Sequence, residues 1–258
     1  MKKIKIGIFD IDGTIFRSSL LIELVRGLVR AGVFPKKANQ EMENDYLAWL
    51  NRVGDYDDYL GKVIKIYDKY ILGKKFNEVE KVASGVMDGE KDKVYRFTRD
   101  LIPELKKKGY YLIAISGSPS YMVDKFAFHM GFDVSFGATT GVKDGRFTNY
   151  YIQKDFKTDH DILLGLKDRQ KLLNFSRKDL LLKKYLISRN FEIDWKNSIA
   201  AGDSGNDIHM LKLVGNPIAF NPDDVLVNTA KRKKWRVVVE RKNVVYDLKK
   251  FDFIRYKK

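Results

Sequence analysis

The sequence predicts an α/β protein, a doubly wound parallel sheet with a small all-helical segment inserted after the first strand. Two observations lead to this fold class. Short, nearly continuous apolar runs recur along the chain and alternate with helical patterns, which is typical of parallel strands covered on both faces. In addition, residues 17–92 show helical periodicity and no convincing strand.

The predicted strands come first, because they define the sheet. The apolar runs are found at residues 4–9, 111–115, 198–201, 218–220 and 237–239. A helix is predicted to follow the second run, with Ser118 as N-cap, Pro119 as first helical residue and Gly131 as the stop after Met130. Residues 148–176 are highly charged with weak periodicity, and the sequence leaves open a hairpin, a short helix or a mobile loop.

The helical patterns divide the chain into two predicted parts. Residues 1–16 and 93–258 are expected to form the α/β core, and residues 17–92 a helical cap domain. Two apolar stripes in the cap segment have helical spacing, Leu20, Leu21, Leu24, Val25, Leu28 and Val29 in one and Tyr59, Leu60, Val63, Ile64, Tyr67 and Ile71 in the other. We expect the tyrosines of this segment to pack inside it, with contact to a substrate as the alternative.

Composition limits the class of protein further. The chain has 258 residues, 44% of them hydrophobic, which is enough to bury a sizeable core. It has no cysteine, which excludes disulfides and thiolate metal sites. Neither a long uncharged apolar run nor a signal peptide is found, so no membrane span is indicated and a cytoplasmic location is expected.

The charge balance favours anionic partners. The chain carries 49 Lys and Arg against 34 Asp and Glu, a formal net charge of +15. The densest basic cluster, KRKKW at residues 231–235, includes an aromatic residue and is the best candidate for a nucleic-acid contact. A solvated surface is the favoured interpretation of these charges, so a small phosphorylated substrate is preferred to nucleic acid.

Polar side chains follow three of the predicted strands, where open α/β sheets bind their ligands. The sequences at these ends are DIDGT at residues 10–14, SGS at 116–118 and GDSGND at 202–207. Converging carboxylates need a cation, and oxygen ligands suit Mg²⁺. A carboxylate also serves as a nucleophile in enzymes that form an aspartyl-phosphate, and a hydroxyl beside a helix N-terminus binds anions. The strand ends therefore predict phosphoryl-transfer chemistry.

The order DIDGT, SGS, Lys and GDSGND resembles the haloacid dehalogenase superfamily of phosphohydrolases, whose four motifs occur in this order. A helical insert directly after the first motif is similar to the phosphoserine-phosphatase-like branch, subfamily IB. The resemblance spans nearly the whole chain and includes DGRFT at residues 144–148 and AFNPDD at 219–224. It implies a Rossmann-like core, a Mg²⁺ cofactor and hydrolysis of phosphomonoesters through an aspartyl-phosphate.

The resemblance also implies roles for individual residues. Asp10 is expected to be the nucleophile and Asp12 the general acid and base. The expected metal ligands are the Asp10 and Asp203 carboxylates and the Asp12 backbone carbonyl, with Asp207 holding a metal-bound water or the motif lysine. Ser116 and Gly117 are expected to bind the phosphoryl oxygens, with Asn206 as a further contact.

The motif lysine and the substrate are less closely defined. Lys178 is expected to be the motif lysine because it begins the helical pattern KDLLLKKYL, with Lys183 or Lys184 as alternatives. Glu23 with Arg26 or Arg52 would be the cap residues that hold an amino-acid substrate, although the surrounding sequence departs from that pattern. The alternatives are a phosphatase of nucleic-acid ends or anionic lipids, and a phosphate-binding protein without turnover. The sequence predicts no oligomeric state.

Overall fold

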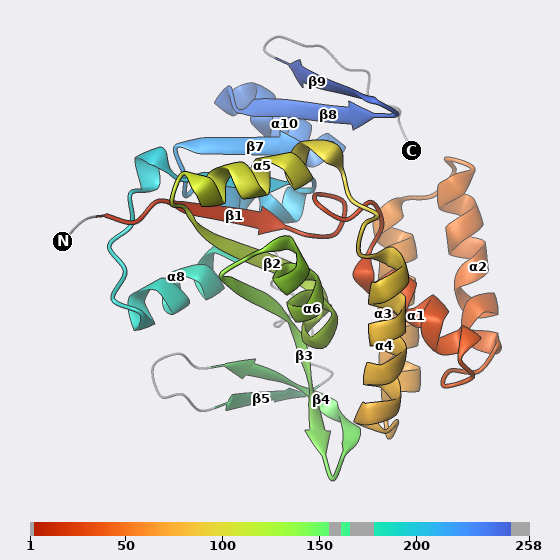
Figure 1. Cartoon of the computed structure of the whole chain (residues 1–258). Coiled ribbons are helices and arrows are strands. Elements are labelled where there is room, and N and C mark those ends of the chain that lie inside the picture. The colour runs from red at the N-terminus through yellow and green to blue at the C-terminus, as the bar shows by residue number, and fades with distance from the viewer. Residues whose placement is uncertain (1–2, 155–160, 166–177, 249–258) are drawn as a thin grey trace.

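The computed structural model describes residues 3–154, 161–165 and 178–248, and every structural statement here refers to those residues (Figure 1). They form one nine-stranded sheet in the order β5-β4-β3-β2-β1-β6-β7-β8-β9. Its strands are β1 (Ile6–Asp10), β2 (Tyr111–Pro119), β3 (Val134–Lys143), β4 (Arg146–Lys154), β5 (Asp161–Gly165), β6 (Ile199–Gly202), β7 (Asn216–Phe220), β8 (Arg236–Arg241) and β9 (Val244–Leu248).

The sheet is parallel in its centre and antiparallel at both edges. β1 pairs in parallel with β2 on one side and β6 on the other, and β3, β7 and β8 extend this parallel part. The pairs β3–β4, β4–β5 and β8–β9 are antiparallel. The predicted parallel doubly wound sheet is therefore confirmed for the centre, while the antiparallel edges add to the prediction.

Helices cover both faces of the sheet, as a doubly wound fold requires. The helices and short 3₁₀ turns of the core are α5 (Arg96–Lys107), α6 (Ser120–Met130), α8 (Lys178–Ser188), η3 (Trp195–Asn197), η4 (Gly205–Asp207), α9 (Ile208–Leu211) and α10 (Asp224–Lys233). Successive side chains of β1 enter opposite cores, Phe9 packing in the cluster that includes α5 and α6, and Ile8 in the cluster that includes α8, α9 and α10. Burial on both faces explains the continuous apolar runs.

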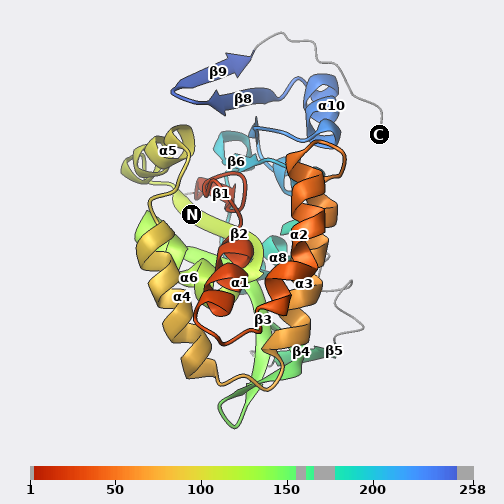
Figure 2. The same ribbon diagram turned by 90° about the vertical axis from the view of Figure 1, so that its right-hand side faces the viewer.

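The segment between β1 and β2 contributes helices before α5. They are α1 (Leu20–Arg30), α2 (Lys37–Leu50), α3 (Tyr56–Ile71) and α4 (Phe76–Glu90). In Figures 1 and 2 they lie together beyond the carboxyl end of β1. The stripe on α1 is fully buried, and on α3 only Leu60 and Ile64 are partly exposed. The helical content of this segment agrees with the sequence, while its status as a separate domain stays a prediction.

Two local expectations need comment. Gly131 has φ +82° and caps α6, as predicted for a left-handed helix stop. The prediction of Ser118 as N-cap is wrong: β2 continues to Pro119, α6 begins at Ser120, and the Ser118 hydroxyl bonds Asp12 instead.

The charged region after residue 148 contains a hairpin. β4 and β5 pair in antiparallel fashion from Tyr150 with Gly165 to Lys154 with Asp161. This agrees with the hairpin alternative as far as residue 165. Residues 155–160 and 166–177 lie outside the described residues, so the expectation of a loop or short helix there is not tested. No helix in the described part of the chain has the length and apolar character needed to cross a bilayer.

Candidate active site

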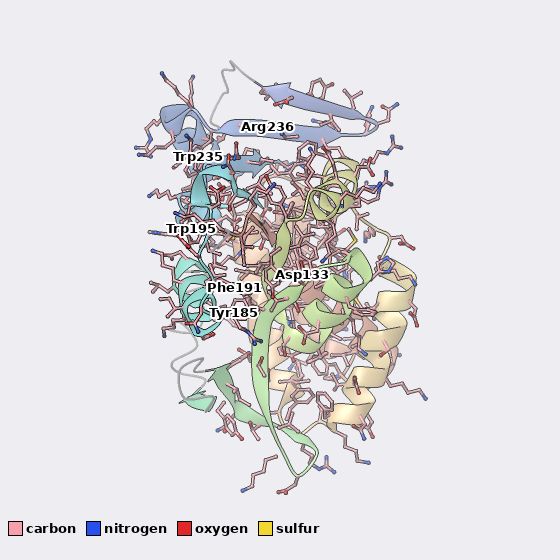
Figure 3. All side chains as sticks on the ribbon, turned by 60° about the vertical axis from the view of Figure 1, so that its left-hand side comes forward. Asp133, Tyr185, Phe191, Trp195, Trp235 and Arg236 are labelled. Carbon is pink, nitrogen blue, oxygen red and sulfur yellow. The ribbon has the colours of Figure 1, made fainter. Side chains whose placement is uncertain are left out.

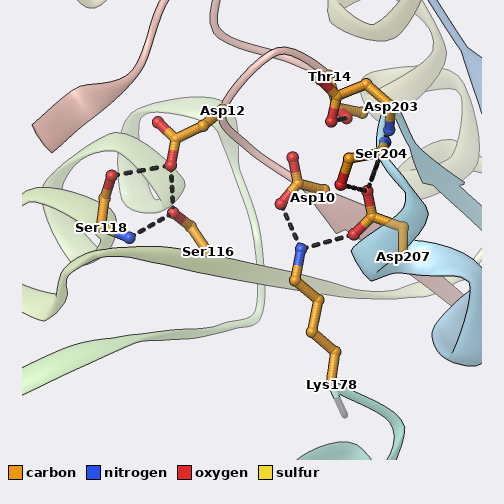
Figure 4. Close-up of polar contacts among 9 residues, drawn as sticks. All are labelled: Asp10, Asp12, Thr14, Ser116, Ser118, Lys178, Asp203, Ser204 and Asp207. Carbon is orange, nitrogen blue, oxygen red and sulfur yellow. Dashed lines mark hydrogen bonds and ion pairs between the residues drawn. The ribbon is translucent and has the colours of Figure 1, made fainter. Parts of the chain in front are cut away.

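The buried ion pairs of Lys178 define the centre of the site. The Lys178 Nζ atom lies 2.5 Å from Asp10 Oδ1 and 2.6 Å from Asp207 Oδ1 (Figure 4). All three side chains are almost completely buried. They come from the carboxyl end of β1, the start of α8 and the turn after β6, so the tertiary structure alone brings them together.

A tight turn after β6 holds Asp207 and Asp203. The second carboxylate oxygen of Asp207 accepts hydrogen bonds from the backbone N–H groups of Asp203 and Ser204, both at 3.1 Å, and from the Ser204 hydroxyl at 3.2 Å. Both oxygens of Asp207 are thus satisfied. The Thr14 hydroxyl donates to Asp203 Oδ1 at 3.3 Å, which ties this turn to the loop after β1.

Glycines allow these loops to approach one another. Gly13 has φ +82°, and a Cβ atom there would lie 2.0 Å from Asp203 Oδ2. A Cβ on Gly202 would lie 2.5 Å from the Asp207 side chain. Glycine is therefore required at both positions, at Gly13 for its backbone conformation as well as for space.

Asp12 lies in a separate set of hydrogen bonds. Its Oδ2 atom accepts from the hydroxyls of Ser116 at 2.5 Å and Ser118 at 2.8 Å, and its Oδ1 atom accepts from the Leu20 backbone N–H at 2.6 Å. Figure 4 shows the Asp12 carboxylate directed toward these serines and away from Lys178. Both oxygens of Asp12 are occupied, and its carboxylate is not part of the cluster around Asp10.

Burial shifts the protonation equilibria of the site toward neutral carboxyl groups. It raises the pKa of Asp10 to about 7, opposed by the Lys178 ammonium and reinforced by Asp207 and Asp12. Burial, followed by the charges of Asp10 and Asp207, raises the pKa of Asp203 well above its ordinary value. For Lys178, burial alone would lower the pKa, but the Asp10 and Asp207 carboxylates raise it, so the ammonium stays charged.

The carboxylate cluster fits a divalent cation. Asp10, Asp203 and Asp207 each offer one oxygen, and these atoms lie within 4.8 Å of one another. Within the described part of the chain, Asp10 and Asp203 each keep one oxygen without a hydrogen bond, whereas Asp207 keeps none. Hard oxygen donors of this kind suit Mg²⁺. Asp10 and Asp203 are therefore the better direct ligands, and Asp207 is better suited to hold Lys178.

The other predicted site residues are the phosphate contacts and the alternatives to the motif lysine. Ser116 is buried beside Asp12, Gly117 is exposed at the end of β2, and Asn206 is exposed in η4. Lys183 and Lys184, the alternatives to Lys178, are both exposed on α8 and do not reach the cluster.

A cavity of about 350 Å³ lies between the α1–α3 helices and the strand ends. Asp203 lines it together with Glu23 and Arg26, two of the predicted cap residues. Arg52 is exposed after α2 and is not among the described residues that line the cavity.

Several residues of the site were missed in the sequence. Thr14 and Ser118 lie within the quoted motifs, where their hydroxyls could have been considered as hydrogen-bond donors to Asp203 and Asp12. Lys93, whose Nζ atom lies 3.1 Å from Glu23 Oε1, carried no local signal. Tyr56 lines the cavity from the first turn of α3 and likewise had no signal beyond its aromatic character.

A doubly wound sheet with a buried cluster of aspartates and one lysine at its carboxyl edge is the arrangement of an α/β enzyme. The model of the haloacid dehalogenase-like hydrolases matches residues 8–212, which include the sequence motifs and Lys178. The chain belongs to this family, and the predicted resemblance to it is confirmed.

Relatives of known name support the same assignment. The phosphoserine phosphatase of Methanocaldococcus jannaschii is 26% identical over 245 residues, covering 94% of this chain and 95% of that protein. The phosphoserine phosphatase of Archaeoglobus fulgidus is 24% identical over 223 residues, covering 86% of this chain but only 54% of that protein. The chain therefore spans about half the length of the second relative and nearly the whole length of the first.

Solved structures share the fold. A Bordetella pertussis protein of unknown function superimposes with a TM-score of 0.67 at 16% identity, covering 92% of this chain and 98% of that one. A phospho-aspartyl intermediate analogue of phosphoserine phosphatase gives a TM-score of 0.57 at 23% identity, with 93% and 95% coverage. At these identities the likeness establishes the fold.

Proposed function

We propose that the protein is a Mg²⁺-dependent phosphomonoester hydrolase that acts on a small phosphorylated metabolite through an aspartyl-phosphate on Asp10. The observation that carries the proposal is the bridge from Lys178 to Asp10 and Asp207, beside the Asp203 carboxylate. The Lys178 ammonium holds one Asp10 oxygen in an ion pair, and the other Asp10 oxygen has no hydrogen bond in the described part of the chain. Such a carboxylate is rigidly held, which is what in-line attack on phosphorus needs.

The proposed reaction has two displacements at phosphorus. In the first, an Asp10 oxygen bonds to phosphorus while the bond to the leaving oxygen breaks, and Asp12 donates a proton to that oxygen. In the second, Asp12 takes a proton from water, which attacks phosphorus, releases inorganic phosphate and restores Asp10. Mg²⁺ held by Asp10, Asp203 and the Asp12 carbonyl would neutralise charge on the phosphoryl oxygens.

The hydrogen bonds of Asp12 suggest how substrate binding would prepare this acid. The Ser116 hydroxyl has one proton to donate and gives it to Asp12 in this structure. If Ser116 instead donates to a phosphoryl oxygen, Asp12 loses one of its hydrogen bonds and becomes free to take up or deliver a proton. We propose that phosphate binding and release of Asp12 are coupled in this way, with Gly117 and Asn206 as further phosphate contacts.

The division into a core of residues 1–16 and 93–258 and a cap of residues 17–92 is part of the proposal. The cap would exclude water during the first displacement and select the leaving group. The cavity of about 350 Å³ favours a small substrate over nucleic-acid ends or lipid phosphates. The cluster at residues 231–235, the sequence-based candidate for nucleic acid, forms the exposed end of α10 and the two residues before β8, at the amino ends of the strands.

The test is release of phosphate from p-nitrophenyl phosphate with Mg²⁺, with EDTA, and with Asp10→Asn. We expect Mg²⁺-dependent turnover that disappears in EDTA and in Asp10→Asn, while Asp88→Asn, an exposed aspartate on α4, keeps wild-type turnover. Full activity in Asp10→Asn would exclude Asp10 as nucleophile. A folded wild type that binds Mg²⁺ without turnover would favour the phosphate-binding alternative.

A further inference from the structure

The cavity beside Asp203 has aromatic residues on one part of its wall and charged residues on another. Five aromatic residues from α2, α3 and the segment before α5 line this cavity: Tyr46, Trp49, Tyr56, Tyr59 and Tyr95. Tyr46, Trp49 and Tyr56 are partly exposed, so part of each ring is not covered by protein. The rings pack on one another, with Trp49 and Tyr59 stacked at 13° between their planes.

The acidic side chain opposite this wall is already neutralised. Glu23 Oε1 accepts a hydrogen bond from the Ser18 hydroxyl at 2.8 Å and forms an ion pair with Lys93 at 3.1 Å, and Arg26 lies 3.9 Å away. Glu23 is only 4% exposed. Two cations and a hydroxyl already share the charge of Glu23 through Oε1, so less of that charge is available to the ammonium group of an amino-acid substrate.

Two guanidinium groups that line the cavity lie over aromatic rings. The Arg26 guanidinium is 5.3 Å from the Tyr46 ring centroid and donates to the Tyr59 hydroxyl at 3.3 Å. The Arg17 guanidinium is 6.0 Å from the Tyr95 ring centroid, and in the described residues it has no carboxylate partner. Exposed ring faces can stack on a flat ligand, and a guanidinium beside them favours a ligand that is electron-rich.

We infer that the substrate is a phosphomonoester whose leaving group carries a flat aromatic ring, held against Trp49, Tyr46 and Tyr56 with Arg26 at its edge. This inference rests on the proposed phosphatase function and names the substrate class of the same site. The phosphate would lie at Asp10 and the ring in the cavity between the α1–α3 helices and the strand ends. The volume of this cavity, about 350 Å³, lies in the range of small-ligand sites.

Two matched substrate pairs test the inference. AMP is compared with ribose 5-phosphate, and O-phosphotyrosine with O-phosphoserine, so that within each pair the ring is the principal difference. We expect kcat/KM at least about tenfold higher for the ring-bearing member of at least one pair. A preference in only the first pair identifies a nucleotide, and in only the second an aryl phosphate. Equal or better turnover of the ring-free member in both pairs overturns the inference.

The preference should depend on the aromatic wall. Trp49→Leu is expected to reduce the ring preference about tenfold, mainly through a higher KM for the ring-bearing member. Phe128→Leu removes a ring that is 87% exposed on α6 and should leave the preference unchanged. An unaltered preference in Trp49→Leu overturns the assignment of the ring to this wall.

A binding measurement separates this inference from the proposed function. Trp195 and Trp235 precede β6 and β8 at the amino ends of the strands, away from the cavity, so Trp49 is the tryptophan that a cavity ligand would reach (Figure 3). In Asp10→Asn, the ring-bearing substrate should quench tryptophan fluorescence and its ring-free partner should not. Trp49→Phe should abolish this quenching, and Trp195→Phe should retain it.

The outcomes are then distinguishable. Mg²⁺-dependent hydrolysis without a preference for the ring-bearing member of either pair would support the phosphatase and overturn the aromatic substrate class. Quenching of Trp49 by a ring-bearing phosphate without hydrolysis in wild type would support the aromatic site and contradict the proposed reaction. Quenching that persists in Trp49→Phe would overturn the placement of the ring in this cavity.

Discussion

The Lys178 ammonium lies 2.5 Å from Asp10 Oδ1, although 168 positions separate the two residues in sequence. Asp10 ends β1 and Lys178 begins α8, so the pair joins the first strand of the sheet to a helix on one of its faces. Both side chains are nearly inaccessible to water. Because a buried charge without a partner is costly, this ion pair affects both the stability of the protein and the proposed reaction.

Replacing Lys178 should therefore destabilise the fold as well as abolish activity. Lys178→Met leaves Asp10 and Asp207 buried without their cation, for which we expect a loss of about 3–5 kcal/mol in the free energy of unfolding. Urea denaturation measures this loss. Lys183→Met, on the exposed side of α8, should change stability by no more than about 0.5 kcal/mol and retain activity. The reverse pattern would make Lys183 the motif lysine.

Mg²⁺ should stabilise the protein, because it relieves repulsion among Asp10, Asp203 and Asp207. At an ion concentration about 100 times Kd, thermal unfolding should shift upward by about 5–10 °C. Asp203→Asn removes one of the repelling charges, so it should raise Tm in EDTA and lose most of the response to Mg²⁺. A wild-type Tm that is the same in EDTA and in Mg²⁺ would contradict the metal site.

Gly13→Ala tests the close approach of the loop after β1 to Asp203. The substitution adds a Cβ atom 2.0 Å from Asp203 Oδ2 at φ +82°, so it should displace this carboxylate and weaken Mg²⁺ binding. Gly109→Ala is the matched control, because Gly109 has φ +75° and open space around its Cβ position. Both variants should lose about 1–2 kcal/mol from backbone strain, but only Gly13→Ala should lose the thermal shift with Mg²⁺.

Asp12→Asn should slow hydrolysis by about 10²–10⁴, the usual contribution of general acid–base catalysis. The amide oxygen can still accept one hydrogen bond from Ser116 or Ser118, so the fold should be retained. Because Asp12 is proposed to protonate the leaving oxygen, the loss should be larger for an alkyl phosphate than for p-nitrophenyl phosphate. Equal rates for wild type and variant with the alkyl substrate would refute this role.

Local sequence was sufficient to predict the centre of the sheet. β1, β2, β6, β7 and β8 coincide with the predicted apolar runs to within a few residues, because strands buried on both faces select apolar side chains at every position. β3 was missed because Val134–Lys143 includes glycines and threonines and lies only half-buried along most of its length. The edge strand β9 was missed although VVYDL is largely apolar, and its side chains are exposed along most of its length.

For the candidate site, the motifs identified Asp10, Asp203 and Lys178 correctly as neighbours but said little about their hydrogen bonds. The prediction that Ser118 caps α6 was wrong because its hydroxyl has a better acceptor in Asp12, 106 positions away in sequence. The ion pair that neutralises Glu23 was also missed, since Lys93 lies 70 positions further along the chain. Partners this distant leave no pattern in the local sequence.

The order of apolar runs and the polar residues that follow them determined the fold class, the family and the edge of the sheet where the chemistry lies, because these features depend on the burial of neighbouring positions along one strand. The tertiary structure decided which lysine pairs with Asp10, which carboxylate oxygens stay available to a cation, and that aromatic rings form the wall of the cavity. These properties depend on distances between segments far apart in the chain, which are set when the helices and the sheet pack together.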